Sequence, residues 1–160
     1  MKADDTHTDS EIAATAIEVP VADIIWDGTN ISDLRVRGTR RSYTKEGVTL
    51  SGNADEITAR WRSSGDAKMN GIAFSMYGSG GYTFTAPTGQ NFTKIEMTLN
   101  GSIGWDNASL GTGWAFVVDY TNQICKVTWT GNAATTVDLL KGASSFNGES
   151  VKSIAFYLSE

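Results

Sequence analysis

The sequence predicts an all-β protein, an antiparallel β-sandwich. Two observations predict it. Apolar and polar side chains alternate along many short segments, whereas no window shows the 3.6-residue period of a helix. Glycine-bearing turns separate these segments, in a chain of 160 residues with 17 Gly and 2 Pro. Successive side chains of a strand point to opposite faces, so this alternation is typical of sheets with one buried face.

The clearest alternation lies within residues 92–130. Three segments there alternate, at 95–99, 114–120 and 125–129. The tripeptide Thr121-Asn122-Gln123 separates the last two and predicts a tight hairpin turn in which Asn122 takes a positive φ. The apolar side chains of these segments are expected to be buried together, among them Ile95, Trp114, Phe116 and Trp129.

The other elements follow along the chain. Residues 12–19 are expected to form a first strand, although their alanines also suit a short helix. Shorter or alternating segments predict strands at 23–26, 34–36, 48–50, 57–61, 72–76, 82–85, 137–139 and 151–158. About ten or eleven strands are therefore expected, in one β-sandwich domain over residues 12–160. Residues 1–11 are acidic and polar, and they predict a flexible N-terminal tail or linker.

Charge and hydropathy exclude some partners. The formal net charge of −5 argues against nucleic acid, because phosphate binding needs a clustered basic surface. The one basic cluster, at residues 35–41, is interpreted as a solvated strand edge. No apolar run approaches the length of a membrane span, so membrane insertion is not expected. The polar start carries no signal peptide, which indicates either an intracellular protein or a mature chain.

Catalytic signatures are sparse, and we expect no enzyme activity. His7 is the only histidine and lies in the predicted tail, where packing cannot hold it beside a nucleophile or a zinc ion. Cys125, the only cysteine, alternates with apolar neighbours and is interpreted as a small buried hydrophobe. Glu96 and Asp119 are mid-strand carboxylates that a glycosidase would need on two sides of a cleft. Lysines near both favour a solvated sheet face instead.

Aromatic residues in predicted loops indicate carbohydrate binding. An exposed ring stacks on the C–H face of a sugar, while neighbouring polar groups bond the hydroxyls. Trp105 fits best, because it lies in the long predicted loop 100–113 beside an Asp and an Asn. The alternative is a tryptophan that folds back as a plug on the end of the sandwich. The candidate ligand-binding residues are Trp105, Asp106, Asn107, Trp26, Tyr77 and Tyr82. The other three tryptophans, at 61, 114 and 129, share strand faces with apolar residues and are expected in the core.

A calcium site is the second candidate. Asp27, Asn30 and Asp33 place oxygen ligands three residues apart in one predicted loop, and hard cations prefer such ligands. We expect these residues to hold a structural Ca²⁺. The alternative is that they form only local hydrogen bonds in a turn, as Asp and Asn commonly do.

Four segments of the second half carry a resemblance to a known class of module. They read GYTFTAPTGQNFTKIEMT, GTGWAFVVD, ICKVTWTGNAATTVDL and SVKSIAFYLSE. In content and order they resemble a recurrent β-sandwich module in secreted and surface proteins of gut bacteria. The resemblance implies a jelly-roll-like, non-catalytic module on an extracellular or cell-surface protein. Such modules often belong to larger multidomain proteins beside carbohydrate-active or adhesive domains, and often contain a structural calcium.

The function expected from the sequence is therefore recognition. We expect a non-catalytic extracellular module that binds polysaccharide or another glycan through exposed aromatic residues. The alternative is a structural or adhesive domain of a cell surface or virion with no small-molecule ligand. A glycoside hydrolase comes third.

Overall fold

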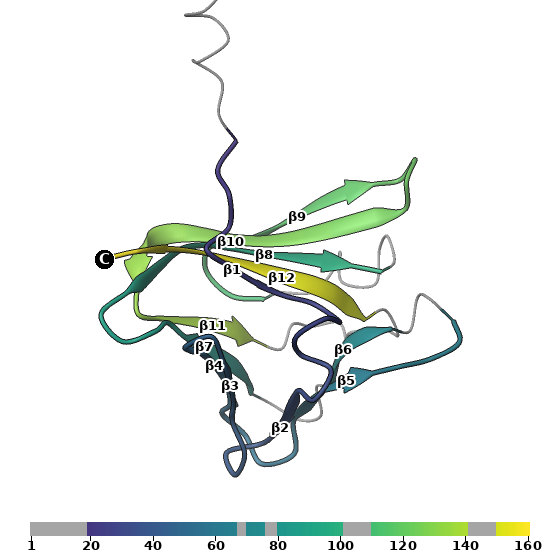
Figure 1. Cartoon of the computed structure of the whole chain (residues 1–160), viewed down its shortest axis with the longest axis horizontal. Coiled ribbons are helices and arrows are strands. Elements are labelled where there is room, and N and C mark those ends of the chain that lie inside the picture. The colour runs from purple at the N-terminus through teal and green to yellow at the C-terminus, as the bar shows by residue number, and fades with distance from the viewer. Residues whose placement is uncertain (1–18, 67–69, 76–79, 101–109, 141–149) are drawn as a thin grey trace, which may run out of the picture.

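The computed structural model describes residues 19–66, 70–75, 80–100, 110–140 and 150–160. These residues form twelve strands and two antiparallel sheets, so the predicted all-β antiparallel sandwich is confirmed (Figure 1). The strands are β1 (Ile24–Trp26), β2 (Arg35–Arg37), β3 (Tyr43–Lys45), β4 (Val48–Gly52), β5 (Thr58–Arg62), β6 (Gly71–Ser75), β7 (Gly81–Thr85), β8 (Asn91–Leu99), β9 (Trp114–Asp119), β10 (Ile124–Ala134), β11 (Thr136–Leu140) and β12 (Val151–Ser159).

The two sheets differ in size. The larger has 8 strands in the order β2-β5-β6-β12-β8-β10-β9, with β1 paired to β12 beside this path. The smaller has 4 strands in the order β11-β7-β4-β3. The chain passes repeatedly from one sheet to the other, so both halves of the sequence contribute to each layer. The strands β2 and β9 are the two ends of the path through the larger sheet.

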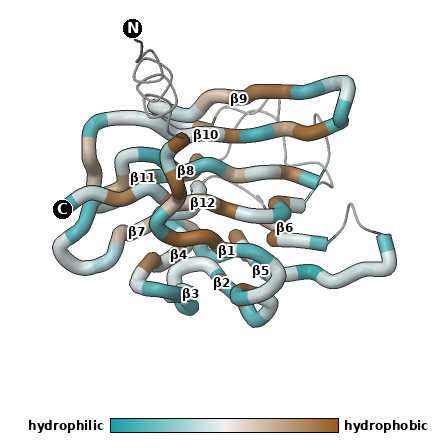
Figure 2. Tube along the Cα trace, turned by 45° about the horizontal axis from the view of Figure 1, so that its top comes forward, coloured by the Kyte–Doolittle hydropathy of each residue, from teal (hydrophilic) through white to brown (hydrophobic). Residues whose placement is uncertain are grey.

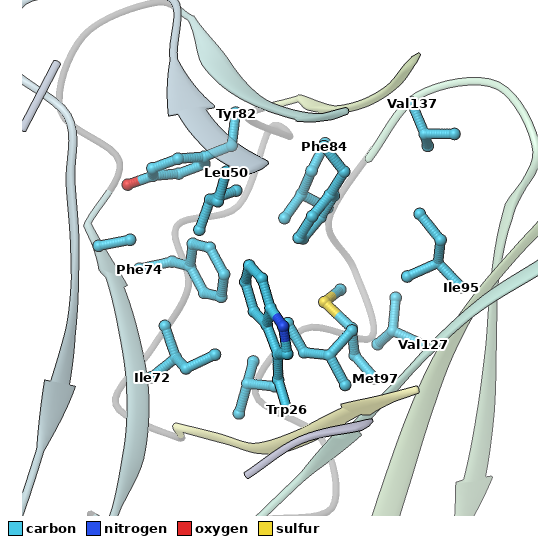
Figure 3. Packing of buried hydrophobic residues seen from close by; sticks show 14 of the residues in the cluster. Trp26, Leu50, Ile72, Phe74, Tyr82, Phe84, Ile95, Met97, Val127 and Val137 are labelled. Carbon is cyan, nitrogen blue, oxygen red and sulfur yellow. The ribbon is translucent and has the colours of Figure 1, made fainter. Parts of the chain in front are cut away.

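Alternation places the core between the sheets. Along β8, Ile95, Met97 and Leu99 are buried, while Lys94 and Glu96 are partly exposed on the outer face. The pairing of β10 with β8 sets Trp129 opposite Ile95 and Val127 opposite Met97, so their inner faces coincide. Apolar side chains from both sheets meet in this layer (Figure 3).

Aromatic rings fill much of this layer. Trp26 is fully buried and contacts Phe156 edge-on at 5.1 Å between ring centroids. Phe84, on the smaller sheet, lies 5.6 Å from Phe156 on the larger one. Figure 3 shows Trp26 between the side chains of β6 and that of Met97. Edge-on aromatic contacts at these distances add to the energy of burial, so this cluster joins the two sheets.

Two hairpins show how the turns are built. Glu46 and Gly47 connect β3 to β4 with φ values of 52° and 84°, which is the two-residue turn that matches strand twist. At the turn before β10 the positive φ of 56° belongs to Gln123, so the prediction for Asn122 is wrong by one residue. Asn122 instead donates its side-chain amide to Asp119 Oδ2 at 2.7 Å.

Other expectations differ in detail. The sequence did not predict β3, a three-residue strand at the edge of the smaller sheet. The predicted segment at 125–129 is also too short, because β10 continues to Ala134 through a shift in register after Thr130. The predicted tail at 1–11 and most of the predicted first strand at 12–19 lie outside the described residues. Among the residues described, no helix is long and apolar enough to cross a membrane.

Candidate functional site

The structure describes two of the six predicted ligand-binding residues, and both are in the core. Trp26 and Tyr82 have no exposed surface, so the prediction that they present rings to a ligand is corrected. The indole nitrogen of Trp26 donates to the Lys45 carbonyl at 3.3 Å, and the Tyr82 hydroxyl donates to the Thr58 carbonyl at 2.5 Å. Buried aromatic residues with a polar atom need such partners, and here the backbone supplies them. The remaining candidates, Tyr77, Trp105, Asp106 and Asn107, lie outside the described residues.

A different pair of aromatic rings is partly open to solvent. Trp114 and Phe116 lie on β9 with Val118, two residues apart along the strand, and all three are half-buried. They face the same side as the buried Trp129 and Val127, which are their partners on β10. We call Trp114, Phe116 and Val118 the aromatic strip. The prediction that Trp129 and Ile95 are core residues is confirmed, whereas Trp114 and Phe116 are only partly buried.

The unequal size of the sheets explains this exposure. The strip lies at the end of the eight-stranded sheet, and the smaller sheet has only four strands to place against it. In Figure 1 the β9–β10 hairpin extends toward the upper right, away from the smaller sheet. Figure 2 shows the tan to brown colour of apolar residues along β9. An apolar inner face thus continues beyond the described part of the opposing layer.

Hydrogen bonds fix the position of the strip. The Trp114 indole nitrogen donates to the Asp138 carbonyl at 2.8 Å, which ties β9 to β11 of the other sheet. The segment before β9 is also attached to β11, because the Leu140 amide donates to the Leu110 carbonyl at 3.0 Å. In the sequence, residues 101–109, which include Trp105, immediately precede Leu110 and the strip; they lie outside the described residues.

The calcium candidates already have hydrogen-bond partners. Asp27 Oδ1 accepts from the amide and the hydroxyl of Thr29, and Asn30 Oδ1 accepts from the Asp27 amide at 3.0 Å. Asp33 Oδ1 accepts from the Tyr43 hydroxyl at 2.7 Å. These bonds lower the pKa of both carboxyl groups, and the largest cause is the side-chain bond to Thr29 for Asp27 and to Tyr43 for Asp33.

The donor set still has the chemistry of a hard-cation site, because carboxylate and amide oxygens are ligands that Ca²⁺ accepts. Within the described ranges, no three His, Cys, Asp or Glu side chains gather into a metal-binding group. The turn is thus held together by its own hydrogen bonds, and the calcium site stays a prediction.

The two candidate glycosidase carboxylates are not brought together. Glu96 on β8 lies opposite Thr128 of β10, whereas Asp119 on β9 lies opposite Ile124, four residues farther along β10. Strand geometry puts their Cα atoms about 16 Å apart, well beyond the spacing of paired catalytic carboxylates. Glu96 forms ion pairs at 3.5 Å with Lys94 and Lys126. The pKa of Asp119 is lowered, first by the hydrogen bond from the Asn122 side chain and then by those from the backbone amides of the turn.

A basic surface appears that the sequence indicated only in part. The cluster at 35–41 was interpreted as a strand edge, and β2 is indeed at the end of the larger sheet. The structure adds Arg60 and Arg62, because β2 pairs with β5 and Arg35 lies directly opposite Arg60. The signal that would have found this surface is simple: all six arginines of the chain occur in the two segments 35–41 and 60–62.

Comparison with known proteins leaves the question of family open. The chain matched no protein-family profile, no curated protein and no solved structure.

Proposed function

We propose that this chain is a non-catalytic recognition module that binds carbohydrate at the β9 end of the sandwich. The observation that carries the proposal is the aromatic strip, where Trp114 and Phe116 are partly exposed on a strand paired into the larger sheet. Residues two apart on one face are about 7 Å apart, so the two rings offer adjoining apolar surfaces. Sugars bind such surfaces by stacking their C–H faces on them.

The residues 101–109 supply the polar part of this proposal. They carry Trp105, Asp106 and Asn107, and the chain that follows them enters β9 through Leu110. Loops on rigid β scaffolds commonly carry recognition residues. In this proposal the strip supplies the stacking surface, and the polar residues that precede it in the sequence supply hydrogen-bonding groups for sugar hydroxyls. The resemblance to a module of extracellular and surface proteins fits a recognition role of this kind, although it assigns no site residues.

The test is retention on a panel of immobilised neutral polysaccharides. Wild type is expected to be retained on at least one of them with micromolar to millimolar affinity, since a solvated sugar exchanges water hydrogen bonds for protein ones of similar strength. Trp105→Ala and Trp114→Ala are each expected to abolish retention. Tyr120→Phe is the control, because Tyr120 is 70% exposed and stands beyond the end of β9. The proposal would be contradicted if both alanine variants were retained like wild type, or if the wild type were retained on no polysaccharide of the panel.

A second candidate function rests on a different observation. The outer face of the β9–β10 hairpin exposes apolar side chains, with Val117 at 65% and Ile124 at 39%. Together with β9, the end strand of the larger sheet as the structure describes it, this surface suits a structural or adhesive domain that packs against other proteins. A wild type that binds no glycan but associates through this hairpin, with the association lost in Val117→Lys, would favour this function.

A further inference from the structure

The larger sheet carries a row of arginines on its outer face at the end opposite the aromatic strip. Arg35 and Arg37 alternate with the buried Val36 on β2, and Arg60 and Arg62 alternate with Trp61 on β5. Because Val36 faces the core, the arginines on each side of it face outward. We call Arg35, Arg37, Arg60 and Arg62 the arginine face (Figure 1 shows β2 and β5).

The register brings these side chains close together. Arg35 is the direct cross-strand partner of Arg60, so the two cationic side chains leave the sheet side by side. The backbones of Arg37 and Arg41 form an isolated antiparallel β-bridge across the following turn, and this pairing extends the row by one more arginine. Directly opposed side chains are about 5 Å apart at Cβ, and neighbours along one strand face about 7 Å. The row therefore presents several guanidinium groups within the span of a short oligomer.

No described carboxylate lies within 4.0 Å of the guanidinium groups of the arginine face, and the two ion pairs between described side chains join Lys94 and Lys126 to Glu96 on β8. In the segments that flank β2 and β5, Asp33 accepts from Tyr43 and also interacts with the charge of Arg41, and Asp55 accepts from the Thr39 hydroxyl. The row is thus a positive surface on a protein whose formal net charge is −5.

Protection of a sheet edge does not explain the choice of residues. Charged side chains discourage edge-to-edge pairing, and lysine serves for this purpose. The chain has seven lysines, yet every outward position of β2 and two of the three on β5 hold arginine. Like charges directly opposite each other destabilise a sheet, so the pair Arg35 and Arg60 has an energetic cost. An anion that bridges the two would offset that cost.

From this arrangement we propose that the arginine face binds an acidic polysaccharide whose charges are carboxylates. Arginine presents a planar fork of donors that matches a carboxylate in two parallel hydrogen bonds, and its charge persists at every physiological pH. The proposal rests on the proposed function in taking a glycan as the ligand. It uses a separate surface, because the arginine face and the aromatic strip lie on opposite faces and at opposite ends of the sheet.

Nucleic acid fits this surface less well. Proteins that bind single strands interleave basic residues with aromatic rings on which bases stack. The outward positions of β2 and β5 hold only arginine and Thr58, while Trp61 faces inward. A duplex carries one charge for about every 1.7 Å of its axis, and the net negative charge of this protein opposes so dense a polyanion.

The experiment measures binding of the full chain to polygalacturonate at low and at physiological salt. Wild type is expected to bind, more weakly as salt rises, and to lose binding when the carboxylates of the same polymer are methyl-esterified. Arg35→Ala/Arg60→Ala is expected to bind at least about tenfold more weakly, since charge-assisted hydrogen bonds to two groups are lost. Arg35→Lys/Arg60→Lys keeps both positive charges but loses the paired guanidinium donors. Its affinity for polygalacturonate is expected to lie between those of wild type and the double alanine variant.

The matched control is Lys126→Ala/Lys152→Ala, which removes the same charge. Lys126 is on β10 and Lys152 is on β12, so neither belongs to the basic surface. This control is expected to bind like wild type. Equal loss in the control and in Arg35→Ala/Arg60→Ala would overturn the proposal, because only net charge would then matter.

Two further arms separate the alternatives. Binding to dextran sulfate or to a single-stranded oligonucleotide as tight as to polygalacturonate would overturn the assignment of a carboxylated polysaccharide. No binding of wild type to polygalacturonate would overturn it as well. Trp114→Ala is expected to leave polygalacturonate binding unchanged. If the protein binds no neutral polysaccharide but binds polygalacturonate through Arg35 and Arg60, the arginine face is supported and the aromatic site is rejected. If it binds a neutral polysaccharide but not polygalacturonate, only the arginine face is rejected.

Discussion

Trp114 lies directly opposite Trp129 in the antiparallel pair of β9 and β10, yet the two rings differ in exposure. Trp129 is 8% exposed and belongs to the core, whereas Trp114 is half-buried at the end of the sheet. The same cross-strand position thus holds one tryptophan that supports the fold and one that is available for contact. This difference can be measured.

Alanine at the two positions is expected to have unequal effects on stability. Trp129→Ala removes a buried ring and is expected to cost about 3–5 kcal/mol. Trp114→Ala removes a half-buried ring with one hydrogen bond, and about 1–3 kcal/mol is expected. Urea unfolding of both variants checks the order. Equal costs would mean that Trp114 is as buried as its partner and unavailable to a ligand.

Gly113 supports Trp129 through its lack of a side chain. A Cβ there would lie 2.6 Å from the Trp129 indole nitrogen and 2.8 Å from the Thr130 carbonyl, and φ is +90°. Backbone strain alone would lower the free energy of unfolding of an alanine variant by about 1–3 kcal/mol, and the collision adds to this. Gly113→Ala is therefore expected to cost more than strain alone. Thermal or urea unfolding gives the value.

Two other glycines separate strain from collision. Gly89 has φ +81° with nothing within 4 Å of its Cβ position, so Gly89→Ala reports strain alone. Gly65 has neither a positive φ nor a neighbour, and Gly65→Ala is expected to be neutral or slightly stabilising. A Gly113→Ala variant no less stable than Gly89→Ala would show that Trp129 shifts without cost.

Alternation in the sequence was sufficient to predict the layers but not their limits. The buried residues of β8 and β10, and the short strands at 24–26 and 35–37, follow from local pattern alone. The exposure of Trp114 depends on how far the opposing sheet extends, which no local pattern encodes. Trp26 was predicted at the end of a strand, just before a turn, and its ring was expected to face a ligand, but the ring points to the inner face and meets Phe156.

The arginine face shows the same limit. The segments that contain Arg35 and Arg60 are separated by two strands of the other sheet, and only the register of β2 with β5 makes the two residues neighbours. From the sequence, Arg60 was one residue of an alternating strand. Pairing between distant segments, rather than the character of either one, created the surface.

The calcium prediction is tested by chelation. If Asp27, Asn30 and Asp33 hold Ca²⁺, excess chelator should lower the melting temperature of metal-loaded protein, because a ligand bound only by the folded state stabilises it. Asn30→Ala should remove this response, while Asn122→Ala, in the turn between β9 and β10, should keep it. A melting temperature insensitive to chelator on protein shown to contain the metal would reject the site.

The bond from Tyr43 to Asp33 predicts how stability depends on pH. The Tyr43 hydroxyl donates to Asp33 Oδ1 at 2.7 Å and lowers the pKa of that carboxyl, while burial and this bond raise the pKa of Tyr43. A carboxyl with a lowered folded-state pKa stabilises the fold above its unfolded pKa, about 3.9, and this contribution is lost as pH falls through the lowered value. Tyr43→Phe should therefore reduce the melting temperature at neutral pH, and the difference from wild type should shrink in acid below about pH 4.

Tyr120→Phe, at an exposed tyrosine, is the control and should match the melting temperature of wild type at every pH. A difference that stays constant from neutral to acid pH would show that Tyr43 acts by packing against Trp26, its ring neighbour at 5.7 Å, and not through the carboxylate.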